Sequence, residues 1–192
     1  MKILLIAATQ QEAIEDKFEG CTVLITGVGM VNTSIQLTKE LLQNKYDLVI
    51  NMGLAGSFLD AIKIGNVVEV IEDSFSELGF ENGLEFDQFS DFRLVTEYSV
   101  DGKTDLEKLK GITVNTVHGN EASIAEIRNR LKPDVESMEG AAVLKVCKEF
   151  SIPCMQIRAI SNKVEKRNKE NWNMTLAIQN LNDSVEKIIA EL

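Results

Sequence analysis

Carboxylate and amide side chains stand next to the apolar runs of this sequence. Glu12 follows the first run, within AATQQEA, and Glu139 precedes an apolar helical pattern, within VESMEGAA. Ser161 and Asn162 end the run MQIRAISN. A carboxylate can take a proton or accept two hydrogen bonds, and an amide can donate and accept at once. Each acid taken alone has a simpler explanation, because acids in the first turn of a helix complement its dipole.

Two glycine-rich segments lie between these groups. TGVGMVNT contains Gly29, and NMGLAGSF contains Gly56. Glycine lets a backbone N–H approach a small polar ligand closely, although a tight turn needs the same residue. The first segment lacks the third glycine of a dinucleotide fingerprint, because Thr33 occupies that region, and neither segment carries a Lys or Arg for a phosphate. We therefore expect no dinucleotide and no other cofactor.

Short apolar runs alternate with helical periodicity from end to end. The runs are rich in Ile and Val, as is typical of buried strands, and they span residues 3–8, 22–26, 48–52, 67–71, 112–117 and 155–160. Apolar stripes indicate four helices, through Val31, Ile35, Thr38 and Leu42; Ile124, Ile127 and Leu131; Val143, Val146, Cys147 and Phe150; and Ile178, Leu181, Val185, Ile188, Ile189 and Leu192. This alternation predicts a single α/β domain over residues 1–192, with a central mixed, largely parallel sheet flanked by helices.

The carboxyl ends of the strands are where ligands of open α/β sheets bind. Chemistry is therefore expected at four strand exits, at residues 9–12, 27–33, 51–57 and 161–167. The segment 74–98 is the least regular part of the chain, and a long irregular loop in a compact domain is often functional. We interpret this segment as a candidate lid.

Composition excludes several classes of partner. A formal net charge of −10 argues against a nucleic-acid surface, because neutralising phosphates needs clustered Lys and Arg. The three cysteines form no CxxC pair, so neither a disulfide framework nor a metal site is expected. The opening MKILLIAA is too short for a signal peptide or a membrane span. We therefore predict a cytoplasmic protein with no nucleic-acid and no membrane partner.

Five segments together resemble a known family. MKI…AATQQE, ITGVGMVNT, NMGLAGS, VESMEGAA and IRAISN, in this order, resemble the methylthioadenosine/S-adenosylhomocysteine nucleosidase branch of the purine nucleoside phosphorylase and nucleosidase superfamily. Within it, RAISNKVEKRNKENWN and SELGFENG are most similar to the futalosine hydrolases of the alternative menaquinone pathway. The resemblance implies a small-molecule purine nucleoside as substrate, cleaved at its N-glycosidic bond.

The resemblance also implies roles for single residues. Glu12 matches the general base that polarises the attacking water, and Glu139 matches the carboxylate that binds the ribose hydroxyls. Met138 matches a thioether packed against the sugar, while Ser161 and the glycines Gly29 and Gly56 belong to the binding motifs. Asn162 stands where adenine-specific nucleosidases have an Asp, and an amide cannot give a proton to the purine. Asn162 can instead hydrogen-bond N7 and a 6-oxo oxygen, so a 6-oxopurine such as the hypoxanthine of futalosine is expected.

Further positions depart from the family or reach beyond its core motifs. Leu54 replaces a small hydroxyl residue, and His118, the one histidine, is interpreted as a loop residue. Arg93 and Arg167 are the candidate cations for the benzoate of futalosine, although each has a simple surface explanation. By analogy with the family, a homo-oligomer, a dimer or larger, is expected.

Three other functions stay open on the sequence. A phosphorylase would need an Arg near the glycine-rich segments, which carry none. An adenine-type nucleosidase is disfavoured by Asn162. A non-catalytic nucleoside-binding module would not need both Glu12 and Glu139, since binding requires no activated water.

Overall fold

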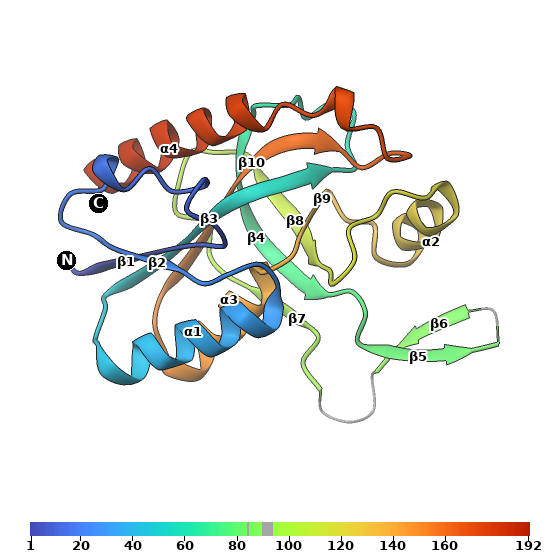
Figure 1. Ribbon diagram of the computed structural model, residues 1–192. Helices are drawn as coiled ribbons and strands as arrows, with labels where there is room; N and C mark the ends of the chain where they lie inside the picture. The colour runs from blue at the N-terminus through green and yellow to red at the C-terminus, as the bar shows by residue number, and fades with distance from the viewer. Residues whose placement is uncertain (84, 90–93) are drawn as a thin grey trace.

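The predicted α/β fold is confirmed by a computed structural model that describes residues 1–83, 85–89 and 94–192. An eight-stranded mixed sheet runs in the order β10–β4–β8–β9–β3–β1–β2, with β7 paired to β4 (Figure 1). Most pairings are parallel. Its strands are β1 (Ile3–Ala7), β2 (Thr22–Ile25), β3 (Leu48–Ser57), β4 (Val67–Phe75), β7 (Glu97–Ser99), β8 (Lys108–Thr113), β9 (Val135–Ser137) and β10 (Cys154–Lys163).

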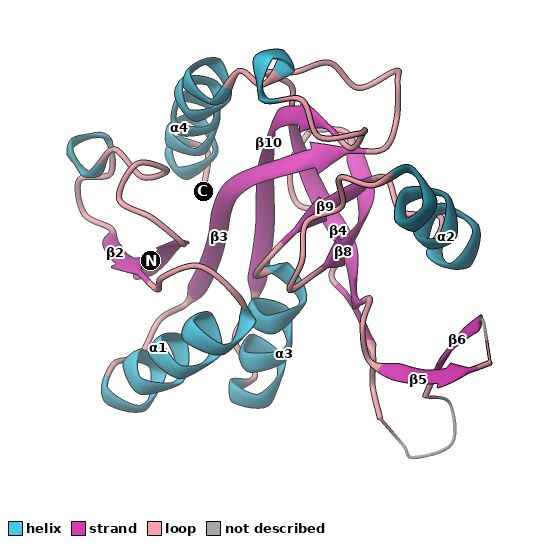
Figure 2. Cartoon of the chain, turned by 45° about the vertical axis from the view of Figure 1, so that its right-hand side comes forward, coloured by secondary structure: helices cyan, strands magenta, loops and turns pink. Residues whose placement is uncertain are grey.

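Helices cover both faces of this sheet. Figures 1 and 2 show α1 (Met30–Gln43) and α3 (Gly140–Phe150) side by side on one face, and α4 (Met174–Ala190) on the other. The helix α2 (Glu121–Leu131) connects the end of β8 to the start of β9 and lies to one side of both strands. Two buried apolar clusters fill the spaces between the sheet and its helices, one toward α4 and one toward α1 and α3. No helix among the described residues is long and apolar enough to span a membrane.

Three strands continue beyond their predicted ends. β4 runs to Phe75, β3 to Ser57 and β10 to Lys163, so the segments 51–57 and 161–163 lie within strands and not after them. The glycines do not end β3, because this half of the strand stays paired with β10 as far as Ser57, across a single register shift at Ser161. β8 also begins at Lys108, four residues before its predicted start. The three-residue strand β9 and the edge strand β7 were not predicted, because they are too short to show a period.

Five strands close into a ring that positions the site. β3 pairs with β10 and β9, β10 with β4, β4 with β8, and β8 with β9. The closure brings the ends of β3 and β10 to the start of α3, which follows β9 after two residues. Three segments that are far apart in the sequence thereby meet at one edge.

The buried face of α1 differs from the predicted one. Val31, Ile35 and Leu42 are exposed, at 69%, 46% and 72%, whereas Thr33, Leu37 and Leu41 are the buried residues. Both stripes have helical spacing, so periodicity finds the helix and does not decide which stripe faces the sheet. The prediction of the helix is confirmed, and that of its face is wrong.

The segment 74–98 is not the irregular loop that the sequence suggests. It holds the end of β4, a hairpin of β5 (Gly79–Asn82) and β6 (Glu85–Gln88), and the start of β7. Figures 1 and 2 show the hairpin projecting from the body of the molecule. No described residue of this segment lines the pocket presented below, so a lid formed by it within this chain is not supported. Arg93 lies outside the described residues.

Candidate active site

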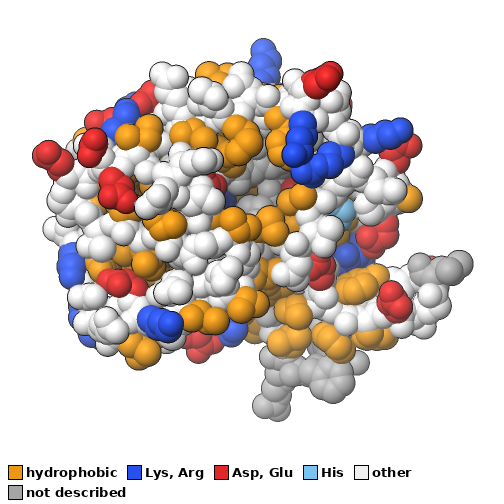
Figure 3. Space-filling view, in the orientation of Figure 1, with side chains coloured by type: hydrophobic (Ala, Val, Ile, Leu, Met, Phe, Trp, Pro, Cys, Tyr) orange, Lys and Arg blue, Asp and Glu red, His pale blue; other side chains and the backbone are white. Residues whose placement is uncertain are grey.

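A cavity of about 250 Å³ opens where β1, β3, β10 and the start of α3 meet. The face drawn in Figure 3 is hollowed near its middle, and apolar side chains border the hollow. Among the predicted site residues, those that line the cavity are Glu12, Gly56, Met138, Glu139, Ser161, Asn162 and Arg167. Gly29 does not line it. The structure therefore brings together residues from both ends of the sequence.

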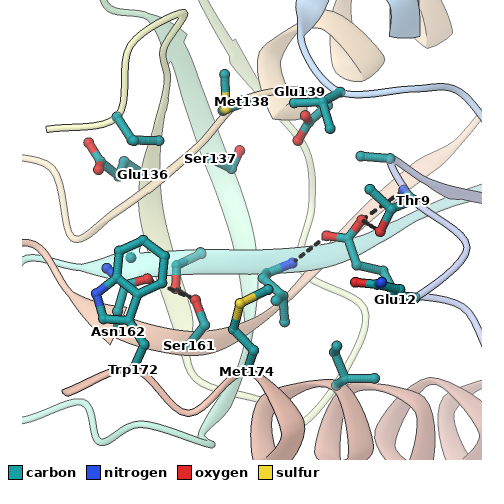
Figure 4. Close-up of a pocket in the computed structure, with 18 of the residues that line it drawn as sticks. Thr9, Glu12, Glu136, Ser137, Met138, Glu139, Ser161, Asn162, Trp172 and Met174 are labelled. Carbon is teal, nitrogen blue, oxygen red and sulfur yellow. Dashed lines mark hydrogen bonds between the residues drawn. The ribbon is translucent and has the colours of Figure 1, made fainter. Parts of the chain in front are cut away.

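Glu12 is held by three hydrogen bonds at one end of the cavity. Its Oε2 accepts from the backbone N–H of Thr9 at 2.9 Å and from the Thr9 hydroxyl at 3.0 Å, and its Oε1 accepts from the N–H of Leu54 at 3.2 Å. Figure 4 shows the carboxylate turned toward these groups. A fixed carboxylate that borders a cavity has the geometry of a general base.

The loop that carries Glu12 is tied to α4. The side chain of Asn182, which is fully buried, donates to the carbonyl of Glu12 at 3.0 Å and accepts from the N–H of Ile14 at 2.8 Å. No α-helix follows Glu12, since the next element is a short 3₁₀ turn that starts at Glu15. The simpler explanation of Glu12 as a helix N-terminal acid is therefore wrong.

Glu139 lies at the same end of the cavity as Glu12 and occupies the N-cap position of α3. Its side chain makes no capping hydrogen bond, and its Oε1 accepts from the N–H of Gly29 at 2.9 Å. Burial raises the pKa of this carboxyl, and the charge of Glu12 acts in the same direction, while Arg158 and the Gly29 N–H oppose the shift. Gly29 adopts φ +94°, which orients its N–H, so Gly29 acts on Glu139 and not as part of the lining.

A buried polar network lies behind these two carboxylates. Arg158 is 1% exposed, its guanidinium packs against Gly53, and its Nε donates to Gln156 at 3.1 Å. Gln156 in turn donates to Asp73 at 3.0 Å. Burial raises the pKa of Asp73 to about 6, against the hydrogen bonds from Gln156 and Thr113 and the charge of Arg158. Arg158 Nη2 has no hydrogen-bond partner among the described residues, while Nη1 and Glu12 Oε1 both lie beside Gly53.

Asn162 lies at the opposite end of the cavity (Figure 4). The pairing of β10 with β3 shifts register between Ile160 and Asn162, and such a bulge re-aims the side chains beside it. Ser161 Oγ donates to Asn162 Oδ1 at 2.8 Å, and Asn162 Nδ2 donates to the carbonyl of Lys163 at 2.9 Å. One amide N–H and part of the oxygen's accepting capacity are left for a ligand. A Cβ at Gly56 would lie 2.9 Å from Val164 Cγ2 and 3.1 Å from Asn162 Nδ2, so any larger residue here would displace these two side chains.

His118 and Glu136 form a pair at the same end. His118 Nδ1 lies 2.6 Å from Glu136 Oε2, and the backbone N–H of His118 donates to Glu136 Oε1 at 3.1 Å. Glu136 is 4% exposed, and both side chains line the cavity. His118 is a loop residue, as predicted, and the structure adds Glu136 as its partner.

Arg167 and Trp172 complete the lining on this side. The guanidinium of Arg167 lies 5.0 Å from the centre of the Trp172 ring, a cation–π distance. The N–H of Arg167 donates to the carbonyl of Gly119 at 3.1 Å, which ties the segment after β10 to the loop that holds His118. Met174 lies beside them in the cavity wall.

The sequence did not single out Thr9, Glu136, Arg158 and Trp172 as site residues. Thr9, Glu136 and Trp172 line the cavity and lie inside motifs whose other members were singled out, so their position in the motif was the available signal. Arg158 gave no signal of its burial, because a charged residue in a strand usually faces solvent. Among the described residues no cluster of His, Cys, Asp or Glu is arranged to hold a metal ion.

The fold is that of the nucleoside phosphorylases and nucleosidases. The chain belongs to the phosphorylase superfamily, whose sequence model matches residues 10–191. It is 27% identical over 188 residues to a futalosine hydrolase of Thermus thermophilus, covering 91% of this chain and 84% of that one. It is 31% identical over 176 residues to a 5′-methylthioadenosine/S-adenosylhomocysteine nucleosidase of Bacillus subtilis, covering 83% and 76%.

Solved structures agree on the fold. The native structure of a futalosine hydrolase of Helicobacter pylori superimposes with a TM-score of 0.86 at 16% identity, over 100% of this chain and 98% of that one. N-glycosidic nucleosidase activity is the class of activity that the sequence matches support.

Proposed function

We propose that this protein hydrolyses the N-glycosidic bond of a 6-oxopurine nucleoside, with futalosine as its substrate and hypoxanthine as the released base. The observation that carries the proposal is that two carboxylates, Glu12 and Glu139, border one end of a cavity whose other end holds the amide of Asn162. The two carboxylates suit water activation and sugar binding, and the amide of Asn162 suits recognition of a 6-oxopurine.

The carboxylate end matches the needs of N-riboside hydrolysis. The reaction passes through an oxocarbenium-like sugar, so it requires an activated water at C1′ and groups that hold the ribose. Glu12, oriented by Thr9 and Leu54, takes the proton of the attacking water. Glu139 accepts hydrogen bonds from the ribose hydroxyls, and Met138 packs against the sugar.

The amide end matches a 6-oxopurine. The free N–H of Asn162 donates to N7 or to the 6-oxo oxygen, both of which are acceptors. An exocyclic 6-amino group is a donor and would meet this N–H unfavourably. Ser161, by donating to Asn162 Oδ1, fixes the amide in one orientation. This residue is the reason to prefer futalosine over methylthioadenosine, since the curated relatives include enzymes named for either substrate.

Water suits this site better than phosphate as the nucleophile. Arg158 is a cation near the glycines of β3, which the sequence alone did not place there. It is surrounded, however, by Glu12, Glu139 and Asp73, and its charge acts on the last two. A phosphate brought to this end would face two carboxylates in the wall, which repel it.

The benzoate of futalosine would lie against Arg167. An aromatic ring and a cation occur together there, with Arg167 over Trp172 at the cavity wall. A guanidinium binds a carboxylate through two parallel hydrogen bonds, and an indole gives the benzoate ring a flat surface.

A homo-oligomer is part of the proposal. Val31, Ile35 and Leu42 form an exposed apolar stripe along α1, and Val28, at 49% exposed, reaches from its start into the cavity wall. A second copy on this stripe would bury it next to the pocket mouth. Sedimentation of wild type and of Ile35→Glu tests this, and a wild-type monomer would contradict it. The cytoplasmic location stays a prediction.

One assay separates the candidate functions. Purified protein is incubated with futalosine, inosine and methylthioadenosine, with and without phosphate, and the released base is identified. Hypoxanthine released from futalosine without phosphate is the expected result. Preferred cleavage of methylthioadenosine would indicate an adenine-type nucleosidase, and a phosphate requirement would indicate a phosphorylase. Binding of nucleosides without turnover would leave a binding module.

A further inference from the structure

The pair of His118 and Glu136 has no role in the proposed function as stated so far. Glu136 Oε1 accepts from the backbone N–H of His118, and this bond already ties the loop to β9. The second oxygen, Oε2, binds the ring nitrogen Nδ1 at 2.6 Å. Nε2 has no hydrogen-bond partner in the part of the chain that the structure describes, and the side chain lines the cavity. The second contact, from Oε2 to the imidazole, orients the ring and is not needed to attach the loop to β9.

The reaction needs a group that this arrangement supplies. A purine anion is a poor leaving group, so the imidazole ring of the base must be protonated as the C1′–N9 bond breaks. Asn162, the side chain at the base end, has no acidic proton to give. Histidine is the side chain best suited to donate a proton near neutral pH. Both ring nitrogens of an imidazolium carry a proton, so a carboxylate that accepts from Nδ1–H fixes the ring and leaves Nε2–H as the proton to be transferred.

We propose that His118 is the general acid that protonates the departing purine, and that Glu136 is the positioning residue that orients its ring. This inference rests on the proposed nucleosidase function. As the C1′–N9 bond breaks, its electron pair passes to the base, and His118 Nε2–H delivers a proton to N7. Water adds to C1′ and gives a proton to Glu12, and solvent then restores both residues. Nucleoside and water become ribose derivative and neutral base, with no other reactant.

The placement of neighbouring groups agrees with this assignment. A Cβ on Gly56 would lie 3.1 Å from Asn162 Nδ2 and 3.5 Å from Glu136 Cγ, so the amide and the carboxylate flank one glycine of β3. The His118 ring also contacts the Phe58 ring edge to face, with centroids 6.2 Å apart, which restrains the imidazole from the other side. Asn162 and His118 thereby share the base end: the Asn162 N–H donates to the 6-oxo oxygen, and N7 is left to accept the proton from His118.

A substrate whose leaving group needs no proton tests the proposal. 4-Nitrophenyl riboside leaves as a stable phenolate, whereas inosine and futalosine need protonation of the purine. His118→Asn keeps an N–H at the position of Nδ1 for Glu136 and removes Nε2. We expect its kcat for the purine nucleosides to fall by about 10²–10⁴-fold, the usual contribution of a general acid. Its rate on the nitrophenyl riboside is expected to match that of wild type.

Two further variants distinguish the role of the pair. Glu136→Gln is expected to shift the rate ratio between the two substrate classes in the same direction, by a smaller factor, because it weakens the hold on the ring and leaves Nε2 in place. Asn120→Ala is the matched control in the same loop, since Asn120 caps α2 and does not line the cavity. It should leave the ratio unchanged.

Each other outcome is decisive. If His118→Asn slows both substrate classes equally, or slows neither, His118 is not the acid, although the nucleosidase function would stand on the wild-type rates. If wild type cleaves no purine nucleoside under any condition, the proposed function fails and this inference fails with it.

Discussion

Different kinds of contact hold the side chains at the two ends of the cavity. At the Glu12 end, formed by Thr9, Glu12 and Glu139, the carboxylates are held mainly by backbone N–H groups, those of Thr9, Leu54 and Gly29. At the Asn162 end, side chains hold one another: Ser161 binds Asn162, and Glu136 binds His118. Figure 4 shows both ends facing one cavity.

This difference separates what the fold provides from what the sequence can vary. The backbone donors are Leu54 within β3, Thr9 just after β1 and Gly29 just before α1, so they depend on the course of the backbone and not on one side chain. Side-chain pairs change with a single substitution and leave the sheet intact. We infer that the Glu12 end carries the reaction step common to many substrates and the Asn162 end selects the base. Substrate choice can then change on an unchanged fold.

The largest expected effect is at the Glu12 end. Glu12→Gln should keep the fold and nucleoside affinity, because the amide preserves the shape, and lose about 10²–10⁴-fold in kcat because it cannot take the proton of water. The loss should be equal for every substrate, including one with a leaving group that needs no proton. Steady-state rates on inosine, futalosine and a nitrophenyl riboside measure it.

Glu15→Gln is the matched control for this variant, since Glu15 is a nearby exposed carboxylate that lies outside the cavity. It should have wild-type rates. Full activity in Glu12→Gln would remove Glu12 from the mechanism and leave the two ends without a division of labour.

Glu139→Ala should weaken the binding of ribosides and leave the binding of the free base unchanged. Hydrogen bonds to a charged group contribute roughly 1.5–3 kcal/mol each, so losing the contacts to the ribose hydroxyls should lower riboside affinity by about two decades. Calorimetry in a Glu12→Gln background measures nucleoside binding without turnover, and free hypoxanthine is the control ligand. Equal weakening of nucleoside and base would mean that Glu139 acts by shaping the start of α3.

Sequence patterns predicted the Glu12 end better than the Asn162 end. Glu12 and Glu139 lie in segments whose strands and helices have clear periods, so their convergence follows from the topology of an α/β sheet. The helices were found by the same signal, although on α1 two stripes compete and packing against α3 and the sheet decides between them. Contiguous periodicity is local information, and it suffices where the backbone does the positioning.

The Asn162 end depends on contacts that no local pattern records. The closure of five strands into a ring brings His118, after β8, to Glu136 on β9, and the bulge at Ser161 turns Asn162 toward them. A one-residue register shift produces no periodic pattern in the sequence from which it could be predicted. The burial of Arg158 is likewise a result of the three carboxylates around it, which are 19 to 146 residues distant along the chain.

Arg167→Gln should affect only the substrate that carries a benzoate. A charge-assisted hydrogen bond to a carboxylate is worth roughly 1.5–3 kcal/mol, which corresponds to one to two decades in KM for futalosine. Inosine has no carboxylate, so its slower cleavage should not change. Lys166→Gln is the control, because this neighbouring cation lies outside the cavity. A normal KM for futalosine in Arg167→Gln would show that the benzoate is bound elsewhere.

The smallest expected effect, and the one that tests base selection most directly, is that of Asn162→Asp. The carboxylate keeps the shape of the amide and can still accept from Ser161 Oγ, but it loses the N–H that Asn162 offers to a ligand. A 6-oxo oxygen would then face an acceptor, and a 6-amino group would gain one. One neutral hydrogen bond is worth about 0.5–1.5 kcal/mol, so the ratio of kcat/KM between inosine and adenosine should move toward adenosine by up to about tenfold. The fold should be unaffected, because the side chain stands at a bulge and is only partly buried. Glu12→Gln, by contrast, should lower both rates and leave this ratio alone. If Asn162→Asp also lowers both rates without moving the ratio, the amide does not read the base, and selection must lie with His118 and Glu136.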